Sequence, residues 1–333
     1  MPRFDANPKP TSSTHALAEL SGARVVVTGA TGFIGRHVMD ALDRVGAHGV
    51  AVVDRVHADR VHADRGRTLL SGPELSVFDD PMQIAKLVAA LRPDYVIHLY
   101  AEITTERTVR AIESTLRRNL LPSIALMEAC IETKVRRMIL MGSGEEFGPV
   151  TGPFDDSTIP DPPSPYGASK AATTSYAKMF YRAFELPVTV LRPTVAYGPF
   201  QSPRMLIPQI MDALRANRPI DVTEGRQTRD FIHVSDVAEG LLTALVRAET
   251  NGRSYNLGSG EVVTVKQCLS LIEEISGRKG LIRFGALPYK KGEIFSYEPL
   301  LSQTESALGW KAETSLRAGL ASTWNWFVSQ GAE

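Results

Sequence analysis

Tyr166 and Lys170 stand four residues apart, at the start of a long helical pattern that runs to Phe184. On a helix this spacing places both side chains on one face. A lysine ammonium near a tyrosine hydroxyl stabilises the phenolate, so Tyr166 could act as a general acid or base nearer neutral pH. Taken alone, the same spacing is usually an ordinary helix surface, and its meaning depends on the surrounding fold.

A second stretch with chemical meaning is Arg24 to Gly35, where a β-branched apolar run ends in three glycines placed three residues apart. Gly29 permits a tight turn, Gly32 the close approach of a phosphate, and Gly35 close packing of the following helix. A diphosphate bound there would lie on the helix N-terminus. The alternative is a glycine-rich turn in an α/β protein that binds nothing.

The next predicted strand, Gly49 to Asp54, ends in an acid. An acid about 20 residues beyond the glycines can accept both ribose hydroxyls of an adenosine and would repel a 2′-phosphate, so Asp54 favours NAD. Arg55 could instead pair with a 2′-phosphate, which leaves NADP open. Residues 54–58 are repeated as residues 59–63, and we interpret the repeat as a duplicated loop. His57 and His62 within it are better explained by a solvated loop than by a metal site.

Strand-like and helix-like patterns alternate along the first half of the chain. Further strands are predicted at Leu75 to Phe78, Tyr95 to Leu99 and Arg137 to Met141, and helices at Pro81 to Leu91 and at Val109 to Thr133, the latter interrupted by Pro122. This alternation implies βαβ units, a parallel sheet and right-handed crossovers. The polar run from Gly142 to Gly148 follows the fifth strand, at the sheet edge where ligands collect.

Composition excludes several classes of protein. Thirty-seven basic and thirty-seven acidic residues are spread along 333 residues, so there is no electrostatic footprint for nucleic acid or an anionic membrane. No apolar run reaches the length of a membrane span, and Met1 to Ser21 is interpreted as a mobile tail. Cys130 and Cys268 lie in apolar helical patterns and are interpreted as buried hydrophobic residues, which favours the cytoplasm. The expected partner is a small molecule.

Further motifs follow in a fixed order along the chain. Together with the glycine motif and Asp54 they are His98-Leu-Tyr-Ala101, Asn119, Ser143, Tyr166-Gly-Ala-Ser-Lys170, Arg192 with Tyr197-Gly-Pro199, Arg229-Asp-Phe-Ile-His-Val234 with Asp236, Tyr255-Asn-Leu-Gly258 and Leu308-Gly-Trp310. In this order they resemble the extended short-chain dehydrogenase/reductases, specifically the NAD-dependent epimerases/dehydratases, which act on nucleotide-diphosphate sugars. The resemblance covers about Ala23 to Phe327.

The resemblance implies a role for each matching residue. Ser143 would hydrogen-bond the substrate oxygen, Tyr166 would be the catalytic acid/base, and Lys170 would hold the nicotinamide ribose and tune Tyr166. Besides Tyr166 and Lys170, the implied cofactor contacts are Gly29, Thr31, Gly32, Phe33, Ile34, Gly35, Asp54, Arg55, Leu99, Ala101 and Asn119, the last as a brace of the strand ends. The implied substrate contacts are Ser143, Glu145, Arg229 at the diphosphate, and Arg204 in a segment along the nucleotide.

Three departures from the family pattern concern substrate and cofactor detail. Val195 stands where the family commonly has an asparagine at the substrate diphosphate. Val77 stands where an aspartate often touches adenine, although Asp79 or Asp80 could compensate. Tyr100-Ala101 replaces the Ala-Ala pair that faces the sugar.

The implied architecture is α/β, a Rossmann-type doubly wound parallel sheet with a smaller C-terminal substrate-binding lobe. We expect a tail over residues 1–21, a dinucleotide-binding domain over 22–196 joined by elements of 232–258, and the substrate-binding lobe over 197–333. By analogy with the family, helices like 109–133 and 166–184 would pair in a homodimer.

The reaction type depends on the residues after Ser143. In the 4,6-dehydratases of the family the hydroxyl residue is followed by an acid and then a glutamate, whereas this chain has Gly144 and then Glu145. Without a proton donor at 144, dehydration would need Glu146 or a water to substitute. We therefore expect a C4 ketoreductase or 4-epimerase, with dehydratase and then decarboxylase as alternatives. A non-enzymatic NAD(P) sensor would not need the intact serine, tyrosine and lysine, and a steroid or flavonoid reductase would not need Arg229.

Overall fold

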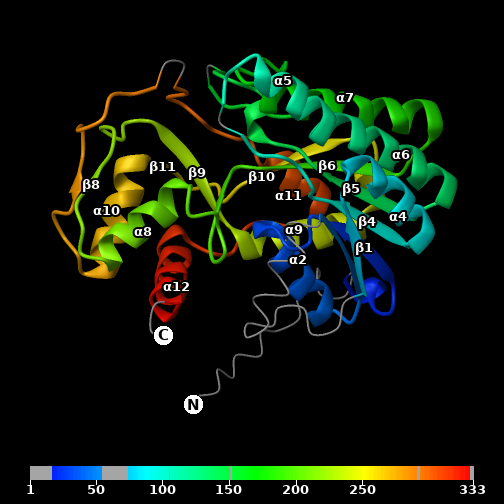
Figure 1. Cartoon of the computed structure of the whole chain (residues 1–333), viewed down its shortest axis with the longest axis horizontal. Helices are drawn as coiled ribbons and strands as arrows, with labels where there is room; N and C mark the ends of the chain where they lie inside the picture. The colour runs from blue at the N-terminus through cyan, green and yellow to red at the C-terminus, as the bar shows by residue number, and fades with distance from the viewer. Residues whose placement is uncertain (1–16, 55–73, 105, 151, 291–292, 331–333) are drawn as a thin grey trace.

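The computed structural model describes residues 17–54, 74–104, 106–150, 152–290 and 293–330. Arg55, the repeated pentapeptide and its two histidines lie outside the described residues. Figure 1 shows a large lobe built on one sheet and a smaller lobe beside it that contains the C-terminal helix.

Seven parallel strands form the sheet of the large lobe, in the order β10-β6-β5-β4-β1-β2-β3. They are β1 (Arg24–Thr28), β2 (His48–Asp54), β3 (Glu74–Phe78), β4 (Tyr95–His98), β5 (Arg137–Met141), β6 (Val188–Pro193) and β10 (Ser254–Leu257). The order runs outward from β1 in both directions, which creates a crevice at the carboxyl ends of β1 and β4. The predicted Rossmann-type doubly wound sheet is therefore confirmed.

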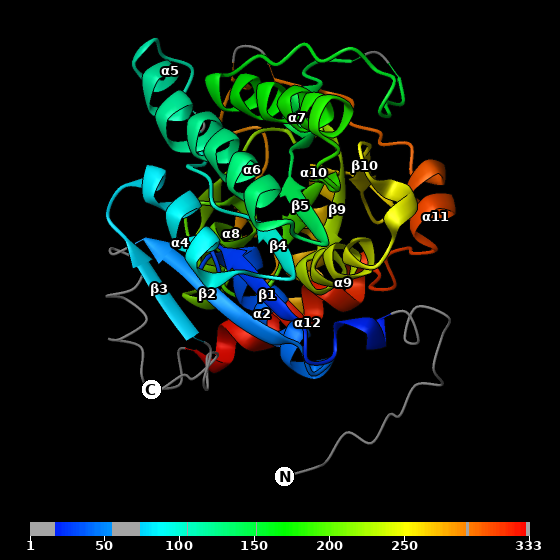
Figure 2. The same cartoon turned by 90° about the vertical axis from the view of Figure 1, so that its right-hand side faces the viewer.

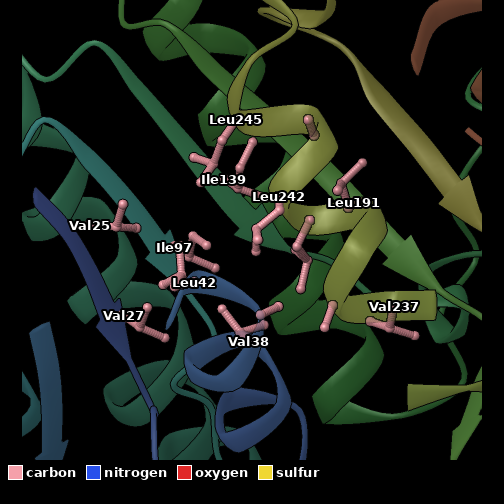
Figure 3. Packing of buried hydrophobic residues seen from close by; sticks show 14 of the residues in the cluster. Val25, Val27, Val38, Leu42, Ile97, Ile139, Leu191, Val237, Leu242 and Leu245 are labelled. Carbon is pink, nitrogen blue, oxygen red and sulfur yellow. The ribbon is translucent and has the colours of Figure 1, made fainter. Parts of the chain in front are cut away.

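Helices cover both faces of this sheet, as a parallel sheet requires. In Figure 2, α4 (Ile84–Leu91), α6 (Leu121–Thr133) and α7 (Pro165–Phe184) lie on one face, and α2 (Phe33–Arg44) and α9 (Val234–Leu245) on the other. Figure 3 shows the second layer, where Val38 and Leu42 of α2 and Leu242 of α9 meet the aliphatic side chains of the strands. These contacts fix the helix that follows the glycine motif against the sheet.

The helix predicted over 109–133 is continuous. Its irregular turn lies just before Pro122, where the sequence predicted an interruption at the proline itself. The helix consists of α5 (Arg110–Thr115), a π-helical turn η3 (Leu116–Leu120) and α6. Pro122 lies in the first turn of α6, where its missing N–H is tolerated, and the hydrogen-bond ladder takes the wider π spacing just before it. The irregular turn carries Asn119.

The smaller lobe has its own sheets and core. Its strands are β7 (Val195–Tyr197), β8 (Ile220–Asp221), β9 (Thr228–His233), β11 (Val262–Thr264) and β12 (Ile282–Arg283), and its helices are α8 (Leu206–Arg215), α10 (Val265–Ser276) and α12 (Leu316–Ser329). Side chains such as Tyr197, Phe231 and Leu269 form its buried cluster. Short 3-10 turns complete the described elements: η1 (Ala18–Leu20), η2 (Pro81–Gln83), η4 (Gly144–Glu146) and η5 (Ala248–Thr250).

Two expected boundaries differ from the structure. The tail was expected to reach Ser21, but Leu20 in η1 is fully buried in the core of the large lobe, because its side chain packs under the sheet. The smaller lobe was expected over 197–333, with elements of 232–258 returning to the large lobe. In the structure β10 lies in the sheet of the large lobe and α9 packs on its core, and so do α11 (Ser302–Leu308) and Trp310.

None of the helices in the described part of the chain has the length and apolarity needed to cross a membrane.

Candidate active site

The glycine motif forms a tight loop between β1 and α2. Gly29 has a φ of +71°, in the left-handed region, and its N–H donates to the carbonyl of Val52 at 2.9 Å. A Cβ on Gly35 would lie 2.2 Å from the carbonyl oxygen of Gly29, so helix and loop touch through bare backbone. Gly32 caps α2 without a side chain. The helix N-terminus is thus open to an anion, and the loop fits a dinucleotide phosphate.

The other predicted cofactor residues surround this loop. Thr31 is buried, and its carbonyl accepts from Arg36 Nε at 2.9 Å, while Phe33 and Ile34 open α2. Asp54 lies half-buried at the tip of β2, beside β1, where a ribose at the loop would come within reach. Leu99 and Ala101 follow β4, and the N–H of Leu99 donates to the carbonyl of Thr28 at 3.1 Å.

Tyr100, which replaces the first alanine of the family's sugar-facing pair, packs against the core of the large lobe. Its ring lies edge-on against Phe78, with 5.2 Å between the ring centroids. Burial is the main cause that raises the pKa of Tyr100, with a smaller contribution from the charge of Asp54.

Asn119 braces the strand end against α7. Its Nδ2 donates to Ser169 Oγ and to the carbonyl of Glu102, both at 3.1 Å, and its Oδ1 accepts from the N–H of Glu102 at 2.7 Å. The amide is buried, so it has no room to exchange these partners for water. Asn119 therefore ties the segment after β4 to the helix that carries Tyr166 and Lys170.

Ser143, Tyr166 and Lys170 come together at the end of β5. Ser143 follows this strand, and its hydroxyl lies near that of Tyr166 in the first turn of α7. Lys170 lies one turn further on, with Nζ 6.0 Å from the centroid of the Tyr166 ring, and donates to the carbonyl of Met141 at 2.8 Å. The spacing of four residues thus places both side chains on the buried face of α7.

The electrostatics differ from the expected picture in one respect. Burial, with a smaller contribution from Glu145, raises the pKa of Tyr166, so the phenol is held protonated in the cofactor-free protein. Burial also lowers the pKa of Lys170 to about 8. The expected lowering of the tyrosine pKa by Lys170 is therefore absent here, because desolvation outweighs the charge and the ammonium bonds a backbone carbonyl instead.

A cavity of about 260 Å³ opens beside these hydroxyls. Its lining includes Ser143, Glu145, Arg229, Glu293 and Tyr297. Val195, which stands where the family commonly has an asparagine, also lines it. Glu145 Oε2 accepts from Ser164 Oγ at 3.0 Å. Arg204 is exposed before α8 and does not line the cavity, unlike the other predicted substrate residues.

Glu293 and Tyr297 are among the cavity residues that sequence reasoning did not predict. Glu293 Oε1 lies 2.7 Å from a terminal nitrogen of Arg229. The arginine that the resemblance assigns to the substrate diphosphate is therefore paired with a carboxylate. The hydroxyl of Tyr297 fills the space beside Gly144, since a Cβ there would lie 1.2 Å from it. Both residues belong to an irregular segment with no motif, and only the tertiary structure brings them to the site.

Comparison with known proteins agrees with this geometry. Residues 25–258 match the model of the NAD dependent epimerase/dehydratase family. The chain belongs to this family. As a member of the NAD-dependent epimerase/dehydratase family, it is an NAD-dependent enzyme of the extended short-chain dehydrogenase/reductase type.

Individual relatives span nearly the whole chain. An uncharacterized UDP-glucose epimerase of Bacillus subtilis is 27% identical over 310 residues, covering 89% of this chain and 95% of that protein. A solved structure of the UDP-glucose 4-epimerase of Thermotoga maritima with UDP-glucose is 27% identical, with a TM-score of 0.80 and coverage of 92% and 99%. The dTDP-glucose 4,6-dehydratase of Streptomyces venezuelae, with NAD and TYD bound, is 25% identical, with a TM-score of 0.79 and coverage of 92% and 97%. This family member is thus similar to enzymes of both reaction types.

Proposed function

We propose that this protein is an NAD-dependent enzyme that transfers hydride at C4 of a nucleotide-diphosphate hexose, as a 4-ketoreductase or 4-epimerase. The observation that carries the proposal is the meeting of the Ser143 and Tyr166 side chains next to the cavity that Ser143 lines, with Lys170 behind the phenol. Two hydroxyls at one point can hold a carbonyl or alcohol oxygen and move its proton.

Each residue then has a defined task. Tyr166, protonated because it is buried, donates its proton to the sugar oxygen in reduction and accepts it in oxidation. Ser143 holds the same oxygen, and Lys170 supplies a positive charge and a hydrogen-bond donor toward the ribose of the cofactor. Bound NAD supplies or accepts the hydride. Asp54 and the glycine loop orient the cofactor by its adenosine and diphosphate ends.

The substrate class follows from Arg229 and from the relatives. The guanidinium lies at the cavity wall, where it can exchange the carboxylate of Glu293 for a diphosphate, which carries more charge and more acceptor oxygens. The relatives described above carry UDP-glucose or dTDP-glucose in their names. We infer a nucleoside-diphosphate hexose without assigning the base.

The second candidate is a 4,6-dehydratase. It is favoured by Glu145 at the cavity and by the Tyr297 hydroxyl, which stands where an acid at position 144 would stand. Against it, Glu146 is fully buried and bonded to Arg192, so it has no path to a substrate. Glu145 also has a plain structural role as acceptor for Ser164, the N-cap of α7. A C4 reaction needs none of these carboxylates.

The mass of the product separates the two candidates. We expect that incubation of the enzyme with NAD and a panel of UDP- and dTDP-hexoses, or with NADH and their 4-keto forms, gives products of unchanged mass or a change of two hydrogens. Because a 4-epimer has the mass of its substrate, proton NMR of the product gives the configuration at C4, and deuterium supplied on the reduced cofactor would appear at C4 after reduction of a 4-keto sugar. Loss of one water from the sugar would instead establish the dehydratase.

We further propose that the protein is a cytoplasmic homodimer. Apolar side chains are exposed along one side formed by α5, η3, α6 and α7: Val109, Ile112, Leu116, Leu121, Tyr176, Met179 and Phe184. A second copy covering this face would bury them, as two-fold contacts do. Free, buried Cys130 and Cys268 suit a reducing compartment. Sedimentation is expected to show a dimer that Met179→Glu converts to monomer. A monomeric wild type would contradict the dimer.

A further inference from the structure

A buried ion pair lies directly behind the catalytic turn, and no step of the proposed reaction uses it. Glu146 is fully buried in η4, and its Oε2 accepts from Nε of Arg192 at 2.9 Å. Arg192, on β6, is 2% exposed and lies over the ring of Phe147 at 4.8 Å. Burial of two charges is costly, because each leaves its hydration shell. Because apolar replacement of a buried ion pair is often neutral or stabilising, stability alone does not account for this pair.

The second oxygen of Glu146 holds the backbone of Ser143. Its Oε1 accepts from the N–H of Ser143 at 2.9 Å, and the hydroxyl of Ser143 accepts from the N–H of Glu145 at 3.2 Å. Together these bonds form a capping box around a single turn. Gly142 makes room for it, since a Cβ at 142 would lie 2.7 Å from Oε1. The Glu146 carboxylate thus holds the backbone N–H of Ser143, and the capping box fixes the turn that follows the serine.

The same turn touches the helix that carries Tyr166. A Cβ on Gly167 would lie 2.7 Å from the carbonyl oxygen of Glu145, so the first turn of α7 rests on the backbone of η4. A small shift of the turn would therefore change the separation of the Ser143 and Tyr166 hydroxyls. An apolar side chain at 146 would fill the space but could not set this direction, because dispersion contacts are not directional.

Arg192 extends the connection away from the site. Its NH1 reaches Asp156 Oδ1 at 3.3 Å, and that carboxylate also accepts from Lys178 Nζ on α7 at 2.7 Å and from the hydroxyl of Ser254 on β10. Charged groups from one strand, one helix, one loop and the 3-10 turn itself thus meet behind the catalytic turn, together with the hydroxyl of Ser254. Each charge in the group has an opposite charge as its neighbour, which is the condition for holding charges in a protein interior.

We propose that Glu146 is a positioning residue for hydride transfer, and that its pair with Arg192 holds Ser143 so that the serine and Tyr166 hydroxyls meet at one substrate oxygen. This inference rests on the roles of Ser143 and Tyr166 in the proposed function. Glu146 itself touches no substrate, because it is fully buried. A misplacement of about 1 Å in such a pair of groups can cost about 100-fold in rate.

The test compares three variants of the full-length enzyme. Glu146→Leu with Arg192→Met removes both charges and the acceptor, and we expect kcat to fall about 10- to 100-fold while KM and NAD affinity stay within about threefold. Glu146→Gln keeps an oxygen for Ser143 and is expected to recover most of this loss. Arg137→Met removes a buried arginine from the opposite end of β5 and is the matched control, expected to keep kcat per folded molecule.

Amide hydrogen exchange gives a readout that needs no substrate. In the double variant the N–H of Ser143 loses its acceptor, so its exchange should accelerate at least about tenfold, while exchange in the Arg137 control stays slow there. Unchanged exchange at Ser143, an unchanged kcat, or a parallel loss of kcat, KM and NAD affinity would each overturn the proposal. If wild type converts no nucleotide sugar, the proposed function fails, and the exchange result alone decides whether Glu146 positions Ser143.

Discussion

Tyr166→Phe is expected to lower kcat by about two to four orders of magnitude, the usual effect of removing a general acid or base. The change deletes only the hydroxyl near Ser143 and leaves the ring on the buried face of α7. Removal of one hydroxyl costs no more than about 1 kcal/mol, the usual net contribution of a single hydrogen bond, so Tm should fall only slightly. Steady-state kinetics on the nucleotide sugar that wild type converts, together with thermal unfolding, measures both effects.

Tyr181→Phe is the matched control for this prediction. Tyr181 lies on the same helix but is 40% exposed and outside the cavity, so the same deletion there should leave both kcat and Tm unchanged. Undiminished turnover in Tyr166→Phe would remove Tyr166 from the reaction. If kcat and the amount of folded protein fall equally in Tyr166→Phe, the Tyr166 hydroxyl stabilises the fold and has no part in the reaction.

Asp54→Asn is expected to reduce the preference for NAD over NADP by about 10- to 150-fold. A hydrogen bond to a charged group contributes about 1.5–3 kcal/mol, and about 1.4 kcal/mol corresponds to a factor of ten in affinity. The carboxylate would both accept from the ribose hydroxyls and repel a 2′-phosphate, and asparagine does neither as well. Titration of the purified protein with NAD and with NADP gives the two dissociation constants.

Asp43→Asn serves as control, because Asp43 is exposed near the far end of α2, away from the glycine loop. It should change neither affinity, although it removes the same net charge. If wild type binds NADP at least as tightly as NAD, then Asp54 is not the selective residue, and Arg55 becomes the candidate for reading the 2′-phosphate.

The elements and their pairing were largely accessible from the sequence. Strand β5 was predicted with its observed bounds, and β2, β3 and β4 within one residue, because buried parallel strands have continuous apolar runs between turn residues. Gly29 and Gly35 were assigned from spacing, and the structure shows the positive φ and the backbone contact that demand glycine. Local chemistry dictated these features, so local sequence revealed them.

The sequence predicted those site residues whose arrangement depends on a single helix or strand. Tyr166 and Lys170 lie on one helix, so their spacing alone predicted a common face, and Ser143 follows a predicted strand. The effect of burial, which raises the pKa of Tyr166, was not predicted, because desolvation depends on how completely other elements cover α7. No periodicity in a sequence carries that information.

What the sequence by itself determined is the Rossmann-type sheet, the glycine loop, the acid at the tip of β2 and the serine, tyrosine and lysine set. The tertiary structure alone decided the cavity partners. Glu293 and Tyr297 come from an irregular segment more than a hundred residues after Ser143. Glu146 and Arg192 are likewise distant in sequence and meet only because β5 and β6 are neighbours. Pairings of this kind follow from the packing of strands and lobes, and packing is set by the whole chain at once.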